Sequence, residues 1–383
     1  MKEKIGYINT LKGLACLGVF LHHLFLIFLP ATYSGQKLDM VIPGDYLFGC
    51  SPLGVLFNGN FYVCLFILIS SFLLSGSIFL STGKKFFVAL IKRYPRLMLP
   101  VLAVNIISQI TFYFLNILSI NVDNLFNSNF LNIIKLSLFD IWVTDSISVA
   151  GYWMMHLLFI GSYISIIVSL FVLKFKKDSY RRIFIFSLFP ILIFFSTYFA
   201  ATIFGVWIAF EMHCTKTIYN LKTKIRQSKA SLLIFTFFTS IIVIYLGGYP
   251  SAGIEYNNVY AIANYLPLII RNSPQLFHIA GALFAIILCF TLDPQIFKHK
   301  VFDFLSDISY SVFLIHPVIH HYFTIPFFSG LKNFFDNPIT LILIVIIVTI
   351  FLVVLFSYLF YKIIECRIQN AINYLVRKFI LFF

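Results

Sequence analysis

Residues 338–364 read PITLILIVIIVTIFLVVLFSYLFYKII. From Pro338 to Tyr361 this stretch contains no charged side chain. An α-helix rises 1.5 Å per residue, so about 20 apolar residues cross the ~30 Å hydrocarbon core of a bilayer. Because lipid offers no hydrogen-bond partner to exposed peptide groups, a single apolar segment of this length crosses the membrane as a helix. The stretch therefore predicts a transmembrane helix.

The same apolar character extends along the chain. Of its 383 residues, 60% are hydrophobic and 11% are charged, whereas soluble domains contain about 25% charged residues. So few charges cannot form a polar shell around a water-soluble core. We therefore predict one all-α polytopic membrane domain over residues 1–383, multi-pass in the plasma membrane, with membrane lipid as a partner. About ten transmembrane helices are predicted, at residues 12–29, 55–80, 97–119, 152–173, 183–198, 200–213, 231–247, 276–292, 304–325 and 338–364.

Two parts of this prediction rest on weaker patterns. One long apolar run, residues 183–210, must fold back on itself to supply the fifth and sixth helices. Between the third and fourth helices, residues 129–139 predict a short helix that lies on the surface.

The lysine and arginine residues indicate how the helices are oriented. Cytoplasmic loops of membrane proteins carry an excess of these residues. With ten alternating helices and both termini in the cytoplasm, 24 of the 28 basic residues fall in inner segments and 4 in outer segments. A different number of helices would mix the two groups. The split therefore predicts cytoplasmic termini, and it accounts for the net charge of +14 without a nucleic-acid partner.

The six cysteines are too widely spaced for a zinc or redox motif. Most of them lie in apolar runs, as is typical of small packing residues. The sequence therefore predicts no metal site.

Ionisable residues inside a predicted membrane helix are costly and are therefore functional candidates. The first helix carries Lys12, His22 and His23. Lys12 and His23 are 11 residues apart, which places them within ~20° of each other on the helix and ~16 Å apart along its axis. His22 points ~100° away from His23. The structural alternative is a lysine that reaches the membrane surface and a histidine bonded to a neighbouring helix.

Two further clusters are polar. Arg93 and Arg96, three residues apart in KRYPRLMLP, share a face at the inner end of the third helix. Guanidinium groups match phosphate oxygens in bidentate fashion, although flanking charges that only set topology would look the same. Ser309 and His316, seven residues apart in SYSVFLIHP, also lie near one face, where a polar patch for helix packing is the alternative.

Together these clusters resemble the membrane acyltransferase 3 superfamily of integral membrane glycan and lipid O-acyltransferases, over nearly the whole chain. That family opens with a basic residue and a histidine eleven positions later, as Lys12 and His23 do here. It places an R-x-x-R-[LI]-x-x-P element at the third helix, matched by residues 93–100, and a Ser–Tyr–Ser helix that ends in histidine, matched by residues 309–316. Smaller matches are Gly161–Ser162, Phe204–Gly205, Gly248–Tyr249–Pro250, His278 before Gly281–Ala282, and Glu365.

Three positions differ from the family pattern. Lys12 stands where the family has arginine, Ser71 where it has glycine, and Leu158 where it has an acidic residue. These differences motivate one alternative, a non-catalytic partner of a glycan assembly complex. A transporter of a glycan or acylated product is the other alternative, although the chain shows no internal repeat and few intramembrane carboxylates for ion coupling.

The resemblance implies an O-acyltransferase with acetyl-CoA or another acyl-CoA as donor and with no metal. The implied acceptor is a hydroxyl of a lipid-linked or exported glycan. Arg93 and Arg96 would hold the donor phosphates, and His23 would act as general base or first accept the acyl group itself. Lys12 would anchor the donor or favour the neutral form of His23. Candidate acceptor-site or supporting residues are Ser309, Tyr310, His316, His278 and Glu365.

Overall fold

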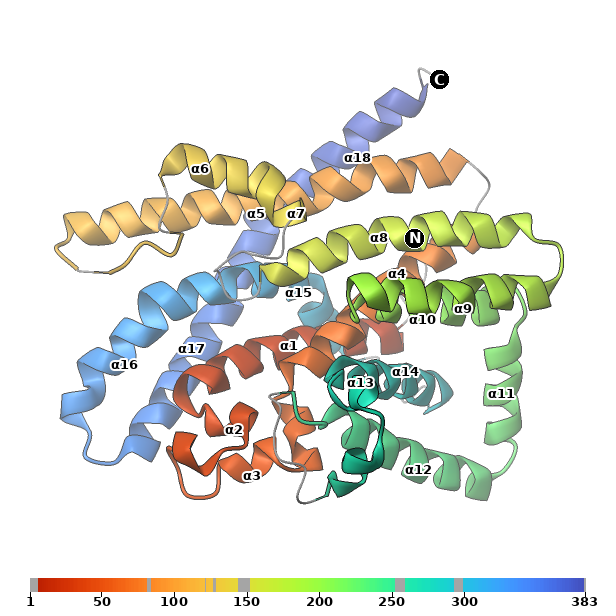
Figure 1. Cartoon of the computed structure of the whole chain (residues 1–383). Coiled ribbons are helices and arrows are strands. Elements are labelled where there is room, and N and C mark those ends of the chain that lie inside the picture. Colours follow the sequence, from red (N-terminus) through yellow and green to blue (C-terminus); the bar gives the residue numbers. More distant parts are fainter. Residues whose placement is uncertain are drawn as a thin grey trace. The chain divides into compact units, whose positions relative to one another are not determined.

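The computed structural model describes residues 6–80, 84–120, 122–126, 129–143, 152–251, 259–292 and 299–381. All regular secondary structure in these residues is helical (Figure 1). Eight segments of the described chain are long and apolar enough to cross a membrane. The predicted all-α polytopic membrane fold is therefore confirmed. The eight segments are α1 (Gly6–Phe28), α4 (Gly59–Phe79), α5 (Lys84–Ile117), α8 (Trp153–Lys174), α12 (Lys229–Gly247), α14 (Pro274–Leu292), a segment that begins with α15 (Lys300–Ile319), and one that joins α17 (Pro338–Phe360) to α18 (Cys366–Leu381).

The fifth and sixth predicted spans are present as helices but are less suited to cross a bilayer alone. They are α9 (Asp178–Phe195) and α10 (Phe199–His213). The first turn of α9 is charged, with Asp178 followed by two arginines, and α10 has only 15 residues. Because 15 residues reach ~22 Å at 1.5 Å per residue, the count of ten crossings and the cytoplasmic position of the termini stay predictions.

Two helices differ in length from their predicted ranges. The predicted third helix begins at residue 97, whereas α5 begins at Lys84 and continues through Pro95 and Pro100. Arg93 and Arg96, expected at the inner end of this helix, lie well inside α5. The last predicted helix ends at residue 364, but α17 passes through a π-helical turn (Tyr361–Glu365) into α18.

The helices form two compact units. The first consists of residues 1–86 and 161–306, and the second of residues 87–160 and 307–383. In the first unit α4 is the central helix and packs against α1, α10 and α14. Figure 1 shows α9 alongside α10, and the two helices are in contact.

Close packing between α4 and α10 depends on small side chains. A Cβ atom at Gly205 of α10 would lie 2.6 Å from both the Leu68 carbonyl oxygen and the Ser71 Cβ. Small residues let membrane helices approach closely and replace the hydrophobic driving force that lipid does not supply. Ser71, which differs from the family's glycine, is thus accommodated by the glycine on the facing helix.

Short helices complete the first unit. They lie between α1 and α4 and between α12 and α14, and one of them, α11, joins α10 to α12. Their bounds are α2 (Ala31–Ser34), a 3-10 turn at Lys37–Asp39, α3 (Tyr46–Gly49), a 3-10 turn at Pro52–Leu56, α11 (Thr217–Arg226), a 3-10 turn at Ala261–Tyr265, and α13 (Leu268–Arg271).

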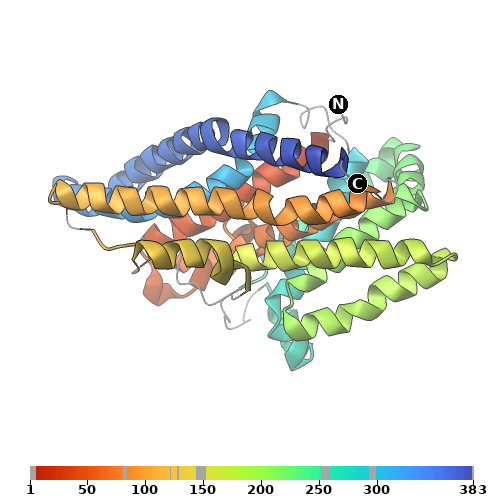
Figure 2. The same cartoon turned by 90° about the horizontal axis from the view of Figure 1, so that it is seen from above.

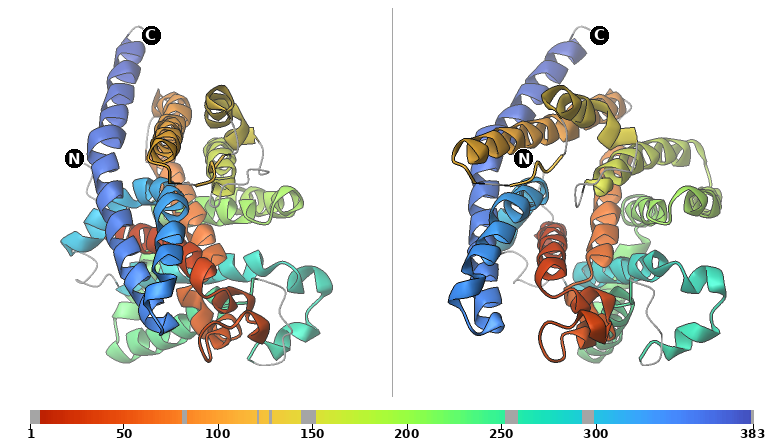
Figure 3. Two further views of the ribbon diagram at one scale, coloured as in Figure 1. Left: turned by 90° about the vertical axis from the view of Figure 1, so that its left-hand side faces the viewer. Right: turned by 60° about the vertical axis from the view of Figure 1, so that its left-hand side comes forward.

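The second unit contains most of α5 together with the C-terminal helices. The short helix predicted at residues 129–139 is present as α6 (Phe130–Lys135), a π-helical turn (Leu136–Asp140) and α7 (Ile141–Val143), whereas its position on the surface stays a prediction. Figures 1 and 2 show this segment alongside α5, where Asn105 of α5 donates a 2.8 Å hydrogen bond to the Ser137 hydroxyl. Figure 3 shows α16 (Ile325–Leu331) beside α17. A π-helical turn (His320–Thr324) joins α15 to α16, and a 3-10 turn (Lys332–Phe334) follows α16.

Candidate active site

In the first unit, the start of α1 is tied to the start of α15. The Lys12 ammonium donates a 3.1 Å hydrogen bond to the Ser306 carbonyl oxygen. One turn earlier, the Asn9 side-chain amide donates to Asp303 over 2.9 Å. A Cβ at Gly13 would lie 2.9 Å from the Leu305 Cβ, so the two helices touch through their backbones here. Lys12 is therefore held by the polypeptide itself at this end of α1.

The two adjacent histidines of α1 differ in their surroundings. His22 Nδ1 is 2.8 Å from the Phe57 carbonyl oxygen, and its ring makes an edge contact with Tyr33 at 5.1 Å between centroids. Its ring also fills the space above Gly59, where an added Cβ would lie 2.4 Å from it. The His23 ring lies 5.3 Å from that of His22. His22 is thus engaged in packing against the start of α4.

The N-terminus of α4 also engages His278 of α14. The Asn58 side-chain nitrogen is 2.9 Å from His278 Nε2 and donates to the carbonyl oxygens of Gly247 and Tyr249 over 3.0 and 2.9 Å. His278 is fully buried, and its Nε2 also lies 2.9 Å from the Tyr249 carbonyl oxygen. Asn58 therefore holds together α4, α14 and the loop that follows α12.

The loops close over this end of the first unit. Ser251 donates a 3.0 Å hydrogen bond to Asn58 Oδ1, and a cavity of about 10 Å³ lies between Tyr33, Phe57, Asn58 and Ser251. That volume is about what one water molecule occupies. Burial raises the pKa of the Tyr33 hydroxyl, so this side chain stays neutral at neutral pH.

In the second unit, α5 and α18 form a basic pocket. The pocket has a volume of about 30 Å³ and is lined by Lys92, Arg96, Gln369, Ile372 and Asn373. The Lys92 ammonium donates a 2.8 Å hydrogen bond to Asn373 Oδ1, and Arg96 and Arg377 both lie within electrostatic range of Lys92. The described residues that line the pocket include two cations and no carboxylate, so the charge of this lining favours an anion.

A buried carboxyl group lies beside this pocket. Glu365 is 4% exposed and accepts hydrogen bonds from the Ser311 hydroxyl at 2.6 Å and from Gln369 at 2.8 Å. Tyr310, next to Ser311 on α15, donates a 2.7 Å hydrogen bond to the Leu97 carbonyl oxygen of α5. The Tyr310 hydroxyl lies within electrostatic range of Glu365, Arg93 and Arg96. These contacts join α5, α15 and α18.

The remaining candidates on α15 are packed inside the second unit. Ser309 and His316 are both fully buried. His316 Nδ1 is 2.9 Å from the Val312 carbonyl oxygen of the preceding turn, and its ring makes an edge contact with His320 at 5.6 Å. The hydroxyl on α15 that donates to Glu365 belongs to Ser311.

The candidates are divided between the two units. Lys12, His23 and His278 belong to the first unit, and Arg96, Tyr310 and Glu365 belong to the second. Among the described residues, no three His, Cys, Asp or Glu side chains come together as a metal ion would require.

Sequence reasoning missed several polar residues of both groups. Asn58 had a detectable signal, because an asparagine before an apolar helix is a frequent N-cap, and its Oδ1 does accept from the Phe61 amide. Lys92 lies in the quoted basic cluster, but its role depends on α18. Gln369 and Asn373 lie beyond the predicted end of the last helix, so no pattern connected them with Arg96.

Three comparisons with known proteins were made, and one of them found a match. A family model described as an acyltransferase domain matches residues 5–358. Searches of curated proteins and of solved structures found no match. The matched range contains the Lys12–His23 face, the Arg93–Arg96 cluster and the α15 motif. The chain therefore belongs to the membrane acyltransferase 3 family, and it is a multi-pass membrane acyltransferase.

Proposed function

We propose that the chain is an O-acetyltransferase of the plasma membrane. It transfers an acetyl group from cytoplasmic acetyl-CoA to a hydroxyl of a surface or exported glycan. Membership of the acyltransferase family supports acyl transfer. The observation that carries the choice of donor is the basic pocket of the second unit, lined by Lys92 and Arg96 without a carboxylate.

The donor is held by its phosphates in this proposal. Guanidinium and ammonium groups bind phosphate oxygens through charge-assisted hydrogen bonds, which are roughly twice as strong as neutral ones. The pocket brings together three cations, Lys92, Arg96 and Arg377. Their mutual repulsion is reduced when an anion binds between them. A ligand with several phosphates, such as a nucleotide-linked thioester, matches that charge. Arg93, three residues before Arg96, completes the set on the same face of α5.

His23 carries the chemistry. As a general base it takes the proton of the acceptor hydroxyl while the acceptor oxygen attacks the thioester carbonyl carbon. The new C–O bond forms, the C–S bond breaks, and the proton ends on the released CoA thiol. Base catalysis of this kind contributes ~10²–10⁴-fold. His278, Asn58 and His22 support the helix ends around it, as their hydrogen bonds to α4 and the loops indicate.

The direct test uses the purified protein in detergent with acetyl-CoA labelled in the acetyl group. Glycan from cells that lack the gene serves as acceptor. We expect label in the glycan with the native chain and at least a hundredfold less with His23→Ala. Detergent carries no gradient, so a transporter would give no product. A native chain that binds acetyl-CoA but yields no labelled glycan, from any extract, would contradict the proposal.

A further inference from the structure

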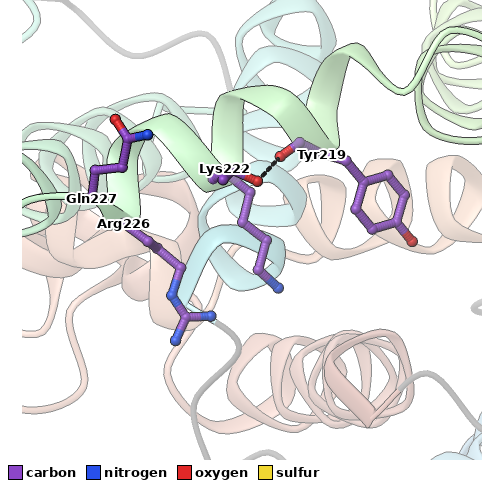
Figure 4. Close-up of a pocket in the computed structure, with 5 residues that line it drawn as sticks. Tyr219, Lys222, Arg226 and Gln227 are labelled. Atoms are coloured by element: carbon purple, nitrogen blue, oxygen red, sulfur yellow. Dashed lines mark hydrogen bonds between the residues drawn. The ribbon is translucent and has the colours of Figure 1, made fainter.

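A basic cluster on α11 and a neutral polar cluster on α5 take no part in the proposed reaction. The first lines a hollow of about 470 Å³. Figure 4 shows that Gln227 points away from Lys222 and Arg226, so these side chains do not converge on one ligand. The second cluster lies in the second unit, at residues 105–109 of α5, and consists of amide and hydroxyl groups.

The polar cluster of α5 occupies one buried face of the helix. Asn105, Ser108 and Gln109 are three and four residues apart, so they lie on the same side of α5, and each is at most 1% exposed. Ile110, which points elsewhere, is 59% exposed. The cluster falls within the predicted span at residues 97–119. Because lipid offers no hydrogen bonds there, a polar side chain needs a partner in the protein or in a ligand.

Asn105 shows how the protein itself supplies such partners. Its side-chain nitrogen donates to the Ser137 hydroxyl over 2.8 Å, and its Oδ1 accepts from the Tyr152 hydroxyl over 2.7 Å. Asn105 thereby joins α5 to the π-helical turn after α6 and to the residue that precedes α8. This amide has the usual structural role of a polar group between membrane helices.

Gln109 lies one turn further along the same face and lacks such contacts. Among the described residues, neither its Nε2 nor its Oε1 has a hydrogen-bond partner, and the adjacent Ser108 hydroxyl has none either. A buried amide without partners costs free energy, because it has lost its hydrogen bonds to water and gained none in the protein. Helix packing therefore accounts for Asn105 but not for Gln109, and an unpaired buried amide of this kind indicates a ligand.

The surroundings of Gln109 favour a neutral ligand that carries hydroxyl groups. Residues 97–117 of α5 contain no charged side chain. On the neighbouring segment, Lys135 and Asp140 pair with each other at 3.9 Å, and their side chains are 70% and 40% exposed. A phosphate would find no buried cation on this face. A side-chain amide both donates and accepts hydrogen bonds, as a sugar hydroxyl does, and the Ser108 hydroxyl can do the same.

The donor pocket lies on another side of the same helix. Arg96 and Gln109 are 13 residues apart, which places them ~140° apart around α5 and ~20 Å apart along its axis. The phosphates of the donor and the polar cluster therefore belong to different sides of α5. Of the two substrates of the proposed reaction, the acceptor fits the cluster better.

We propose that Gln109, together with Ser108, binds a hydroxyl group of the acceptor glycan. This assignment rests on the proposed function, and it gives the two residues a binding role and not a catalytic one. Figures 1 and 2 show α6 alongside α5, where Ser137 contacts Asn105 on the same face. Because Gln109 is only 1% exposed, the glycan reaches it when the segment from α6 to α7 moves aside.

The test compares the native full chain with Gln109→Met, whose unbranched side chain has a similar shape but no amide. The substrates are labelled acetyl-CoA and glycan from cells that lack the gene. Gln109→Met should raise the KM for the glycan about tenfold and leave the KM for acetyl-CoA unchanged. Without substrates it should melt at a higher temperature than the native chain, because no amide is left buried without a partner. A purely structural residue would change the melting temperature alone.

A control and a second measurement accompany these variants. Thr111→Val removes a hydroxyl that donates to the Ile107 carbonyl oxygen within α5 over 2.9 Å, and it should keep both KM values. Hydrogen exchange of residues 130–143 in the native chain should become faster when the glycan is added. At the same glycan concentration, Gln109→Met should show a smaller change.

Three results would overturn the proposal. An unchanged KM for the glycan in Gln109→Met, with acetyl transfer intact in the native chain, would exclude Gln109 from acceptor binding and leave the proposed function in place. A raised KM for acetyl-CoA alone would assign the amide to the donor. Hydrogen exchange of residues 130–143 that does not respond to the glycan would show that this segment does not move for it. A native chain with the glycan-dependent exchange but without acetyl transfer would contradict the proposed function alone.

Discussion

The hydroxyl of Ser311 on α15 donates a 2.6 Å hydrogen bond to Glu365, in the π-helical turn that joins α17 to α18. Glu365 also accepts from Gln369, which lines the basic pocket with Arg96. One buried carboxyl group thus connects α15 to the wall of the pocket. The position of α18, and with it the proposed donor pocket, depends on this contact.

Replacing Ser311 by alanine should destabilise the protein. The change leaves Glu365 buried with one donor fewer, which costs about 1–3 kcal/mol. Ser357→Ala on α17 is the matched control, because Ser357 is also fully buried but its hydroxyl has no hydrogen-bond partner among the described residues. Thermal unfolding in detergent measures both variants. Equal midpoints for Ser311→Ala and Ser357→Ala would show that the contact with Glu365 contributes nothing.

The ion pair between α9 and α10 should respond asymmetrically to substitution. Arg182 donates to both Glu211 oxygens, at 2.6 and 3.0 Å, while the Arg182 side chain is 42% exposed and that of Glu211 only 4%. Arg182→Gln leaves a buried carboxylate without its cation and should lower the free energy of unfolding by up to ~3 kcal/mol. This loss is at the low end of the range for a broken buried ion pair, because the Thr215 hydroxyl still donates to Glu211. Glu211→Gln should cost less than half of that, since the arginine can turn to solvent.

The two variants are compared by denaturant unfolding of the purified protein. A larger loss of stability in Glu211→Gln than in Arg182→Gln would contradict the asymmetry.

The basic pocket should determine the KM for the acyl donor. Arg96→Gln and Lys92→Gln each remove a charge that lines the pocket, so each should raise the KM for acetyl-CoA about tenfold, with a smaller change in kcat. The effect of added salt on the native KM should be large and should shrink in the double variant. Lys378→Gln, near the end of α18 and outside the pocket lining, should leave the KM unchanged. If Arg96→Gln, Lys92→Gln and Lys378→Gln all kept the native KM for acetyl-CoA, the donor would bind elsewhere.

Substitution of the two histidines of α1 should affect acyl transfer differently. His23→Ala should reduce transfer at least a hundredfold, whereas His22→Gln should keep most activity, because a glutamine amide can still donate to the Phe57 carbonyl oxygen that His22 contacts. The measurement is acetylated product per folded protein, with folding checked by monodispersity. An active His23→Ala protein and an inactive His22→Gln protein would reverse the assignment.

The sequence predicted those features that depend on one helix at a time. Apolar length located the spans, because a bilayer demands ~20 apolar residues whatever the rest of the fold does. Helical periodicity separated His22 from His23, and the contacts of His22 with Phe57 and Gly59 agree with it. The helix α5 begins 13 residues before the predicted span, because apolar length locates the part that crosses the bilayer and not the charged turns that continue the helix beyond it.

Features that depend on two distant segments could not be predicted from the sequence. Asn373 follows Lys92 by 281 residues, and only folding brings their side chains to 2.8 Å. The hydrogen bond between Ser311 and Glu365 likewise depends on which side of α15 faces the turn that joins α17 to α18. No periodic pattern in α15 alone contains that information.

The most direct test of the central claim is the mass of surface glycans from cells with the native gene, without it, and with only the His23→Ala chain. We predict that the native cells carry glycan heavier by the mass of one acetyl group per modified unit. That increment should be absent from cells without the gene and from His23→Ala cells that express the chain at native levels. Unchanged glycan masses in cells without the gene would contradict the glycan-modifying function.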